Sequence, residues 1–210
     1  MASFTLSMQR RKILLRDRSL IPECLCRMGK YPGLRHAARL TTVVFFMQGT
    51  IENIFVARER HGEQAGVDAV QVKRGRGIVG DRFCGRHDKP SARNITLIEA
   101  EAIAAVNAAL DLDIPLHGPR RNLVTHGIHL NELVGRIFMI GNIRLQGLEL
   151  CDPCIVLGRN LASAGHGRDV LIQAFHGRGG LRAAVLDDGI IRLGSCITLA
   201  DNLTADGKEY

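Results

Sequence analysis

The hydrophobic pattern of this chain becomes regular only from Met47 onward. Residues 1–46 show no sustained periodicity, whereas segment 47–57 begins a strand-like alternation. Further short strand-like runs, separated by turns, fall at residues 67–72, 123–125, 137–140, 143–150, 181–186, 190–194 and 196–199. The pattern predicts a mainly β domain that starts near residue 47.

Two stretches have helical spacing instead. In segment 98–110, Ala102, Ile103, Val106 and Leu110 recur on one helical face, and acidic residues occupy the first turn. Segment 168–175 predicts a second, short helix. Many short strands with one or two helices indicate a mixed α/β, mainly β fold, namely a closed or nearly closed β-barrel with helical caps.

The strand predicted at 143–150 contains an irregularity. Its apolar residues change parity across Gly147, and a β-bulge there would explain the shift and turn the strand end toward Cys151. Farther along, the acidic turn at 187–189 is expected to join the closing strands as a hairpin.

The formal charge of +7 belongs to the start of the chain. Residues 1–46 contain nine Lys and Arg against two acidic residues, whereas the other 164 residues contain 19 of each sign. A domain without net charge, with only 4% aromatic residues and no Trp, is poorly suited to nucleic acid. We therefore expect no nucleic-acid partner.

Three interpretations of residues 1–46 stay open: a misassigned start, an Arg-rich organelle-targeting peptide, or a small ordered extension. In each, the domain spans 47–204 and residues 205–210 form a tail. No run approaches about 18 apolar residues, so we expect no membrane span. Six cysteines without an export signal indicate a reduced, cytoplasmic location, or a mitochondrial one if the leader is a eukaryotic transit peptide.

A Cys-x-x-Cys pair, Cys151 and Cys154, follows the strand at 143–150. It is open to four interpretations: half of a zinc site, a dithiol redox centre, two partly buried thiols, or one functional thiol beside a structural one. Pro153 sets a tight turn that could present Cys154 at the rim of the barrel. Nearby arginines would favour its thiolate, the form that binds metals or holds a persulfide.

Paired arginines precede the strand at 123–125. Strand alternation through this segment would place Arg120 and Asn122 on one face and Arg121 on the other. Arginine binds phosphate with paired hydrogen bonds, although paired arginines also decorate solvated strands. Two glycine clusters, at 75–80 and 176–180, could add backbone anion sites, with Asp81, Arg82 and Arg178 beside them.

These motifs, in this order, resemble the MOSC domain, the module named after the C-terminal domain of molybdenum cofactor sulfurases. The resemblance covers about residues 50–200 and rests on GIVGDR at 77–82, RNITLIE at 93–99, RRNLVT at 120–125, LVG at 133–135 with FMIG at 138–141, CDPC at 151–154 and GGLR at 179–182. It implies a MOSC-type β-barrel that binds the molybdenum pterin cofactor, or carries sulfur for it, through one cysteine.

By position, the resemblance makes Cys154 the catalytic residue and metal ligand. Arg120 and Asn122 match the segment that contacts the cofactor, Arg121 supplies charge, and the role of Cys151 stays open. The metal is molybdenum or tungsten. Pyridoxal phosphate is not expected, because none of the five lysines lies in a Schiff-base motif.

Three functions follow as hypotheses. The first is a reductase of N-hydroxylated or N-oxide compounds, which needs a separate electron-transfer protein because the chain has no recognisable flavin, haem or iron–sulfur motif. The second is a carrier that holds a persulfide on Cys154 and passes sulfur to a molybdenum enzyme. The third is a small-molecule-binding module without catalysis.

Overall fold

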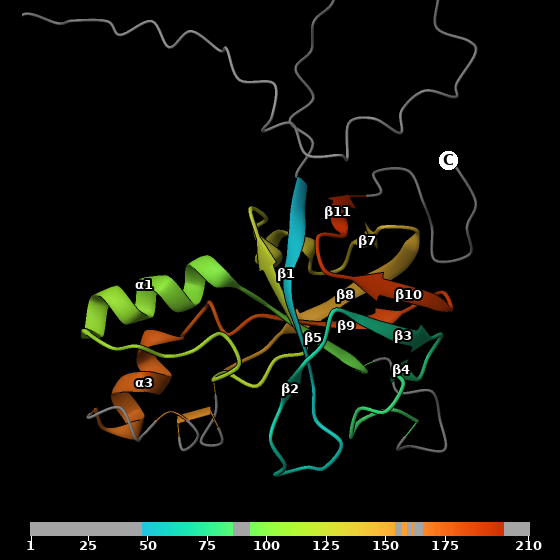
Figure 1. Cartoon of the computed structure of the whole chain (residues 1–210). Coiled ribbons are helices and arrows are strands. Elements are labelled where there is room, and N and C mark those ends of the chain that lie inside the picture. The colour runs from blue at the N-terminus through green and yellow to red at the C-terminus, as the bar shows by residue number, and fades with distance from the viewer. Residues whose placement is uncertain (1–47, 86–92, 154–156, 159–160, 162–165, 200–210) are drawn as a thin grey trace, which may run out of the picture. The chain divides into compact units, whose positions relative to one another are not determined.

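A computed structural model of the chain describes residues 48–85, 93–153, 157–158, 161 and 166–199 (Figure 1). The strands are β1 (Gln48–Val56), β2 (Ala65–Gly66), β3 (Ala69–Lys73), β4 (Gly77–Ile78), β5 (Ile95–Glu99), β6 (Leu123–His126), β7 (Ile137–Ile140), β8 (Ile143–Leu150), β9 (Leu181–Val185), β10 (Gly189–Arg192) and β11 (Cys196–Leu199). The helices are α1 (Ala100–Leu110), the 3-10 helix η3 (Leu130–Leu133) and α3 (Arg168–Ala174).

Seven strands form a closed barrel. They are paired in the order β11-β7-β8-β9-β5-β6-β1, and an additional pairing between β1 and β11 closes the ring. The β5–β6 pair is parallel, whereas the other pairs in the ring are antiparallel. Aliphatic side chains such as Ile51, Leu97, Leu145 and Ile197 fill the core. The predicted mainly β barrel is thus confirmed.

The predicted hairpin at the end of the chain was wrong. Strand β9 pairs with β8 and β5 inside the barrel, whereas β10 pairs with β3 in a separate three-stranded sheet, β10-β3-β4. The acidic turn between them redirects the chain, because Asp187 binds Arg144 and the Oδ1 of Asp188 accepts a hydrogen bond from the backbone N–H of Arg74 at 2.7 Å. The turn therefore connects two sheets instead of two neighbouring strands.

The irregularity predicted at Gly147 is present. The register between β8 and β9 shifts between Gly147 and Glu149. At the same position, the carbonyl oxygen of Leu133 lies only 2.1 Å from where a Cβ would stand on Gly147. A glycine is required here because η3 approaches the strand backbone so closely.

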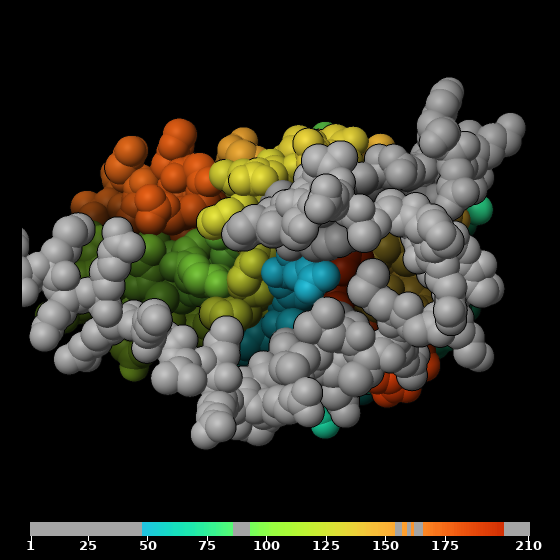
Figure 2. All heavy atoms as spheres, turned by 90° about the horizontal axis from the view of Figure 1, so that it is seen from above, coloured from blue at the N-terminus to red at the C-terminus, as the bar shows by residue number. Residues whose placement is uncertain are grey.

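Helices α1 and α3 pack on the same side of the barrel, opposite β3, β4 and β10 (Figure 1). Figure 2, viewed from above, also shows α3 beside α1. Their buried residues, among them Ile103, Val106, Leu171 and Phe175, form a second core cluster against the outside of β5 and β6. The two predicted helices are confirmed, except that Ile98 and Glu99 end β5 instead of starting α1.

Candidate functional site

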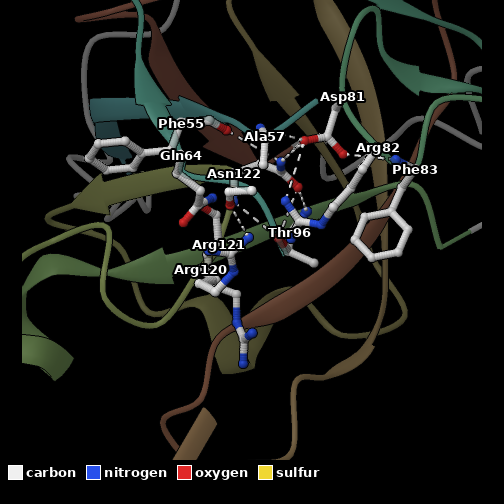
Figure 3. A network of polar contacts seen from close by, with 11 residues as sticks. Phe55, Ala57, Gln64, Asp81, Arg82, Phe83, Thr96, Arg120, Arg121 and Asn122 are labelled. Carbon is white, nitrogen blue, oxygen red and sulfur yellow. Dashed lines mark hydrogen bonds and ion pairs between the residues drawn. The ribbon is translucent and has the colours of Figure 1, made fainter. Parts of the chain in front are cut away.

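The candidate site begins with Asp81, which lies in the turn after β4. Its carboxylate is buried and accepts hydrogen bonds from the backbone N–H groups of Ala57, at 3.2 Å, and Phe83, at 3.0 Å. It accepts a third from the side-chain amide of Asn122, at 3.2 Å (Figure 3). One carboxylate therefore ties together the end of β1, the turn after β4 and the segment before β6.

Asn122 is buried and uses its side chain entirely within the protein. Its Oδ1 accepts hydrogen bonds from the backbone N–H and the hydroxyl of Thr96, at 3.2 and 3.0 Å. Its Nδ2 donates to Asp81 and, at 3.4 Å, to the carbonyl of Phe55. An amide side chain offers about four such bonds. Asn122 therefore positions its neighbours, and no hydrogen-bonding group of its side chain is left for a ligand.

Arg82 stands beside this pair with unused hydrogen-bonding capacity. Its side chain is 9% exposed and its Nη1 lies 3.8 Å from Asp81 Oδ2. This Nη1 is buried, and no hydrogen-bond partner for it exists in the described part of the chain. Burial lowers the pKa of Arg82, Asp81 partly opposes that effect, and Arg120 and Arg121 lower the pKa further. The charges of Arg120 and Arg121 are therefore close enough to Arg82 to disfavour its protonated form.

The segment that carries Arg120 and Arg121 differs from the prediction. Strand β6 begins only at Leu123, and Arg120 has a left-handed backbone with φ of 59°, so strand alternation does not apply to residues 120–122. Arg120 Nη2 donates to the carbonyl of Gly62 at 2.8 Å. Arg121 Nε donates to the carbonyl of Gly179 at 2.9 Å. The two arginines bind different loops, and Figure 3 shows their side chains beside Asn122.

The loop before β2 also belongs to the site, although no residue pattern in the sequence indicates it. Gln64 Nε2 donates to the carbonyl of Arg121 at 3.2 Å, while Gln64 Oε1 is buried without a hydrogen-bond partner among the described residues. The site therefore contains a buried unused donor on Arg82 and a buried unused acceptor on Gln64. Such groups are costly unless a ligand or water completes them.

The chain that leads to Cys154 packs on the loop that Arg121 holds. The backbone N–H of Cys151 donates to the carbonyl of Gly180 at 2.7 Å. A Cβ on Gly179 would lie only 2.0 Å from the carbonyl oxygen of Cys151, so this position needs a glycine. Cys151 itself is a buried free thiol. Cys154 lies outside the described residues, three positions beyond this contact.

Arg178 directly precedes Gly179, whose carbonyl accepts the hydrogen bond from Arg121. It is exposed on the turn between α3 and β9, where its backbone N–H donates to the carbonyl of Phe175 at 3.0 Å. It is not among the groups that lower the pKa of Arg82. Because Arg120 and Arg121 both lower the pKa of Arg82, we call these three residues the arginine cluster.

The histidines nearest each other in sequence are engaged with carboxylates at the start of α1. His126 Nδ1 lies 3.0 Å from Glu101 Oε1, and His129 Nδ1 lies 4.0 Å from Glu99 Oε2. Within the described ranges, no group of three or more His, Cys, Asp or Glu side chains could hold a metal ion. None of the described helices is long and apolar enough to cross a membrane.

The family model of the MOSC domain matches residues 58–198. The chain belongs to the MOSC domain family. This match includes the arginine cluster, Asp81, Asn122 and the Cys-x-x-Cys segment, so the candidate site lies inside the family domain. MOSC domains are associated with the molybdenum cofactor in general.

Solved MOSC-type structures share the fold at low sequence identity. The YuaD protein from Bacillus subtilis is 18% identical with a TM-score of 0.65, over 73% of this chain and 96% of that one. YiiM from Geobacillus stearothermophilus is 17% identical with a TM-score of 0.58, over 74% and 77%. YiiM from Escherichia coli is 17% identical with a TM-score of 0.53, over 76% and 71%. No curated protein sequence matches this chain.

Proposed function

We propose that this MOSC domain binds the molybdenum pterin cofactor, with the arginine cluster holding the cofactor's phosphate and the Cys154 thiolate as a metal ligand. The observation that carries the proposal is the buried Nη1 of Arg82, a charged donor without a hydrogen-bond partner among the described residues, in a region that two further guanidinium groups also influence. Like charges repel unless an anion offsets them, and a phosphate accepts several such bonds.

The residues around the arginine cluster suit that ligand. Asp81 and Asn122 fix the turn and the segment that carry the arginines, so that little ordering is needed when an anion binds. Arg120 donates to the carbonyl of Gly62, and Arg121 donates to the carbonyls of Gly179 and Pro119, so both side chains are held in place by neighbouring loops. The Gly179–Gly180 turn connects this group with the segment that leads to the proposed thiolate.

When bound, the cofactor would supply two-electron metal redox chemistry to the site. We propose that the protein uses it to reduce N-hydroxylated or N-oxide compounds, with electrons from a separate electron-transfer protein. The alternative is a persulfide carrier that hands sulfur from Cys154 to a molybdenum enzyme. The arginine cluster favours the reductase, because a thiol that only carries sulfur has less need of a buried anion site.

The test is to measure metal and pterin in protein purified from a host that makes the cofactor. We expect bound molybdenum and pterin in the wild type and in Cys151→Ala, whose buried thiol serves as the matched control. Cys154→Ala should lose the metal. Equal molybdenum in all three proteins would reject Cys154 as the ligand. A sulfane adduct on Cys154 without pterin, seen by mass spectrometry, would favour the carrier.

A further inference from the structure

The structure also contains an open pocket of about 480 Å³, which lies between strands β1 and β2 and the three-stranded sheet β10-β3-β4. We call it the β2–β3 pocket. Its walls come from the end of β1, the loop between β1 and β2, β2, β3 and the turn after β4. Figure 1 shows where these strands lie. The apolar side chains of these walls are those of Val56, Ala65, Val67, Ala69, Val70 and Val79. Pockets for small molecules usually have volumes of roughly 300–1,000 Å³ and apolar walls, so this one has room for a compact organic ligand.

Part of the apolar lining is exposed in the described part of the protein. Val79 is 42% exposed although it is a large aliphatic residue, and Ala65 is exposed as well. Gly80, which also lines the pocket, has no atom within 4 Å of where its Cβ would stand. A ligand with an apolar body would remove this surface from water.

Charged groups on the lining give the pocket a preferred sign. Two carboxylates, Glu59 and Glu63, and one cation, Arg58, line it. All three residues are exposed, and no ion pair engages either carboxylate within the described residues. The lining therefore carries one net negative charge and favours a cationic or hydrogen-bond-donating group.

The pocket shares two loops with the arginine cluster. Gly62 lines the pocket, and its carbonyl accepts the hydrogen bond from Arg120. Gly80 lines the pocket and directly precedes Asp81 and Arg82. The pocket is thus adjacent in the chain to the proposed cofactor site but opposite in charge.

We infer that the β2–β3 pocket binds small organic molecules that combine an apolar, ring-sized body with a positively charged or hydrogen-bond-donating end. That these molecules include the substrate rests on the proposed function. The binding itself does not, since the described residues that line the pocket include no member of the arginine cluster.

The experiment compares three probes of nearly equal size: benzylamine, which is cationic at neutral pH, neutral benzyl alcohol, and anionic benzoate. Binding to the full-length protein without added cofactor is measured by saturation-transfer NMR titration. We expect benzylamine to bind at least several-fold more tightly than benzyl alcohol, and benzoate to bind least. Equal affinity for the three probes, or a preference for benzoate, would overturn the inference.

Two variants on β3 locate the binding. Gln71 and Lys73 are both exposed and lie two positions apart on the same face of β3, but only Gln71 lines the pocket. Gln71→Trp should therefore abolish benzylamine binding, while Lys73→Trp should retain it. Benzylamine binding that survives in Gln71→Trp would contradict the proposed location.

A double variant tests the charge. Replacing both carboxylates, Glu59→Gln with Glu63→Gln, should bring the affinity for benzylamine down to that for benzyl alcohol without weakening benzyl alcohol. An unchanged preference for benzylamine would contradict the assigned role of the carboxylates. Cys154→Ala should bind the probes like the wild type, so a failure of probe binding and a failure of cofactor loading are seen separately.

Discussion

The side-chain amide of Asn122 donates a hydrogen bond to the buried carboxylate of Asp81, 3.2 Å away and 41 positions distant in the chain. This contact joins the turn that carries Arg82 to the segment that carries Arg120 and Arg121. Both side chains are buried, and neither is a cation that could bind an anionic ligand. Their role is to hold the arginine cluster in place before any anion arrives.

Asn122→Ala should destabilise the protein because it strands several buried polar groups at once. Asp81 would lose one donor, and the backbone N–H and hydroxyl of Thr96 would lose their shared acceptor. Each unsatisfied buried group costs about 1–3 kcal/mol, so we expect a loss in this range or above it. Denaturant unfolding measures it.

The matched control is Asn131→Ala. Asn131 also donates from its side chain to a backbone carbonyl, that of Gly177 at 2.8 Å, but at an exposed position. Its loss should cost less than about 0.5 kcal/mol. Similar losses in the two variants would show that burial of the Asn122 network adds nothing to stability.

Arg82→Met should separate ligand binding from stability. Arg82 is buried beside two other guanidinium groups, and its ion pair with Asp81 is long, at 3.8 Å, while Asp81 keeps three other hydrogen-bond donors. An apolar side chain of similar length should therefore lower the free energy of unfolding by at most about 3 kcal/mol, the low end for a broken buried pair. Retention of a phosphate-bearing cofactor should fall by roughly 10- to 100-fold, which is the value of one charge-assisted hydrogen bond. Denaturant unfolding and pterin content provide the two measurements.

Arg136→Met removes an exposed arginine on the connection between η3 and β7 and serves as the control, with both properties expected to stay at the wild-type value. If Arg82→Met retained full cofactor, the phosphate would have to be held elsewhere. If it unfolded far more easily, the buried charge would be a structural requirement of the turn.

Features that depend on local side-chain periodicity could be predicted from the sequence. The bounds of β7 follow from a continuous apolar run and those of β8 from apolar alternation, and the change of parity across Gly147 marks the bulge. Helix α3 also lies where its spacing indicates. In each case the faces of one element suffice to determine the structure, because a strand or helix must bury one side.

Features that depend on partners distant in the chain could not be predicted. The separation of β9 from β10 depends on pairing with β3, about 120 residues earlier in the sequence. The left-handed backbone at Arg120 breaks the alternation on which the sequence interpretation relied. Gln64 and the carbonyl of Gly62 take part in the site without any residue pattern of their own, because backbone carbonyls carry no sequence signal.

Gly147→Ala should be strongly destabilising. The added Cβ would stand 2.1 Å from the carbonyl oxygen of Leu133, a backbone atom that cannot rotate away. Either η3 or β8 must then shift, at a cost of roughly 1–3 kcal/mol or more. Gly66→Ala in β2 is the control, because its Cβ would meet only ordinary contacts at 3.6 Å. Thermal unfolding of both variants should differ clearly, and equal midpoints would mean that the two segments move apart easily.

The pH dependence of stability should depend in part on the ion pair between Arg144 and Asp187. Arg144 donates through Nε and Nη2 to the two carboxylate oxygens, at 2.9 and 2.8 Å, and through its backbone N–H at 3.0 Å. The side-chain hydrogen bond from Arg144 lowers the pKa of Asp187, although burial opposes the effect. The same bond raises the pKa of Arg144.

Asp187→Asn should therefore destabilise the protein at neutral pH and much less in acid. Because the pKa of Asp187 is lower in the folded protein, its contribution is complete above the ordinary Asp value of about 3.9 and is lost as pH falls through the folded value. The difference in denaturation midpoint between wild type and variant should shrink from pH 7 toward pH 3. Asp169→Asn alters an exposed pair with Arg168 at 3.6 Å and should show no such trend. A constant difference for Asp187→Asn would mean that its effect comes from altered packing of the turn instead of from charge.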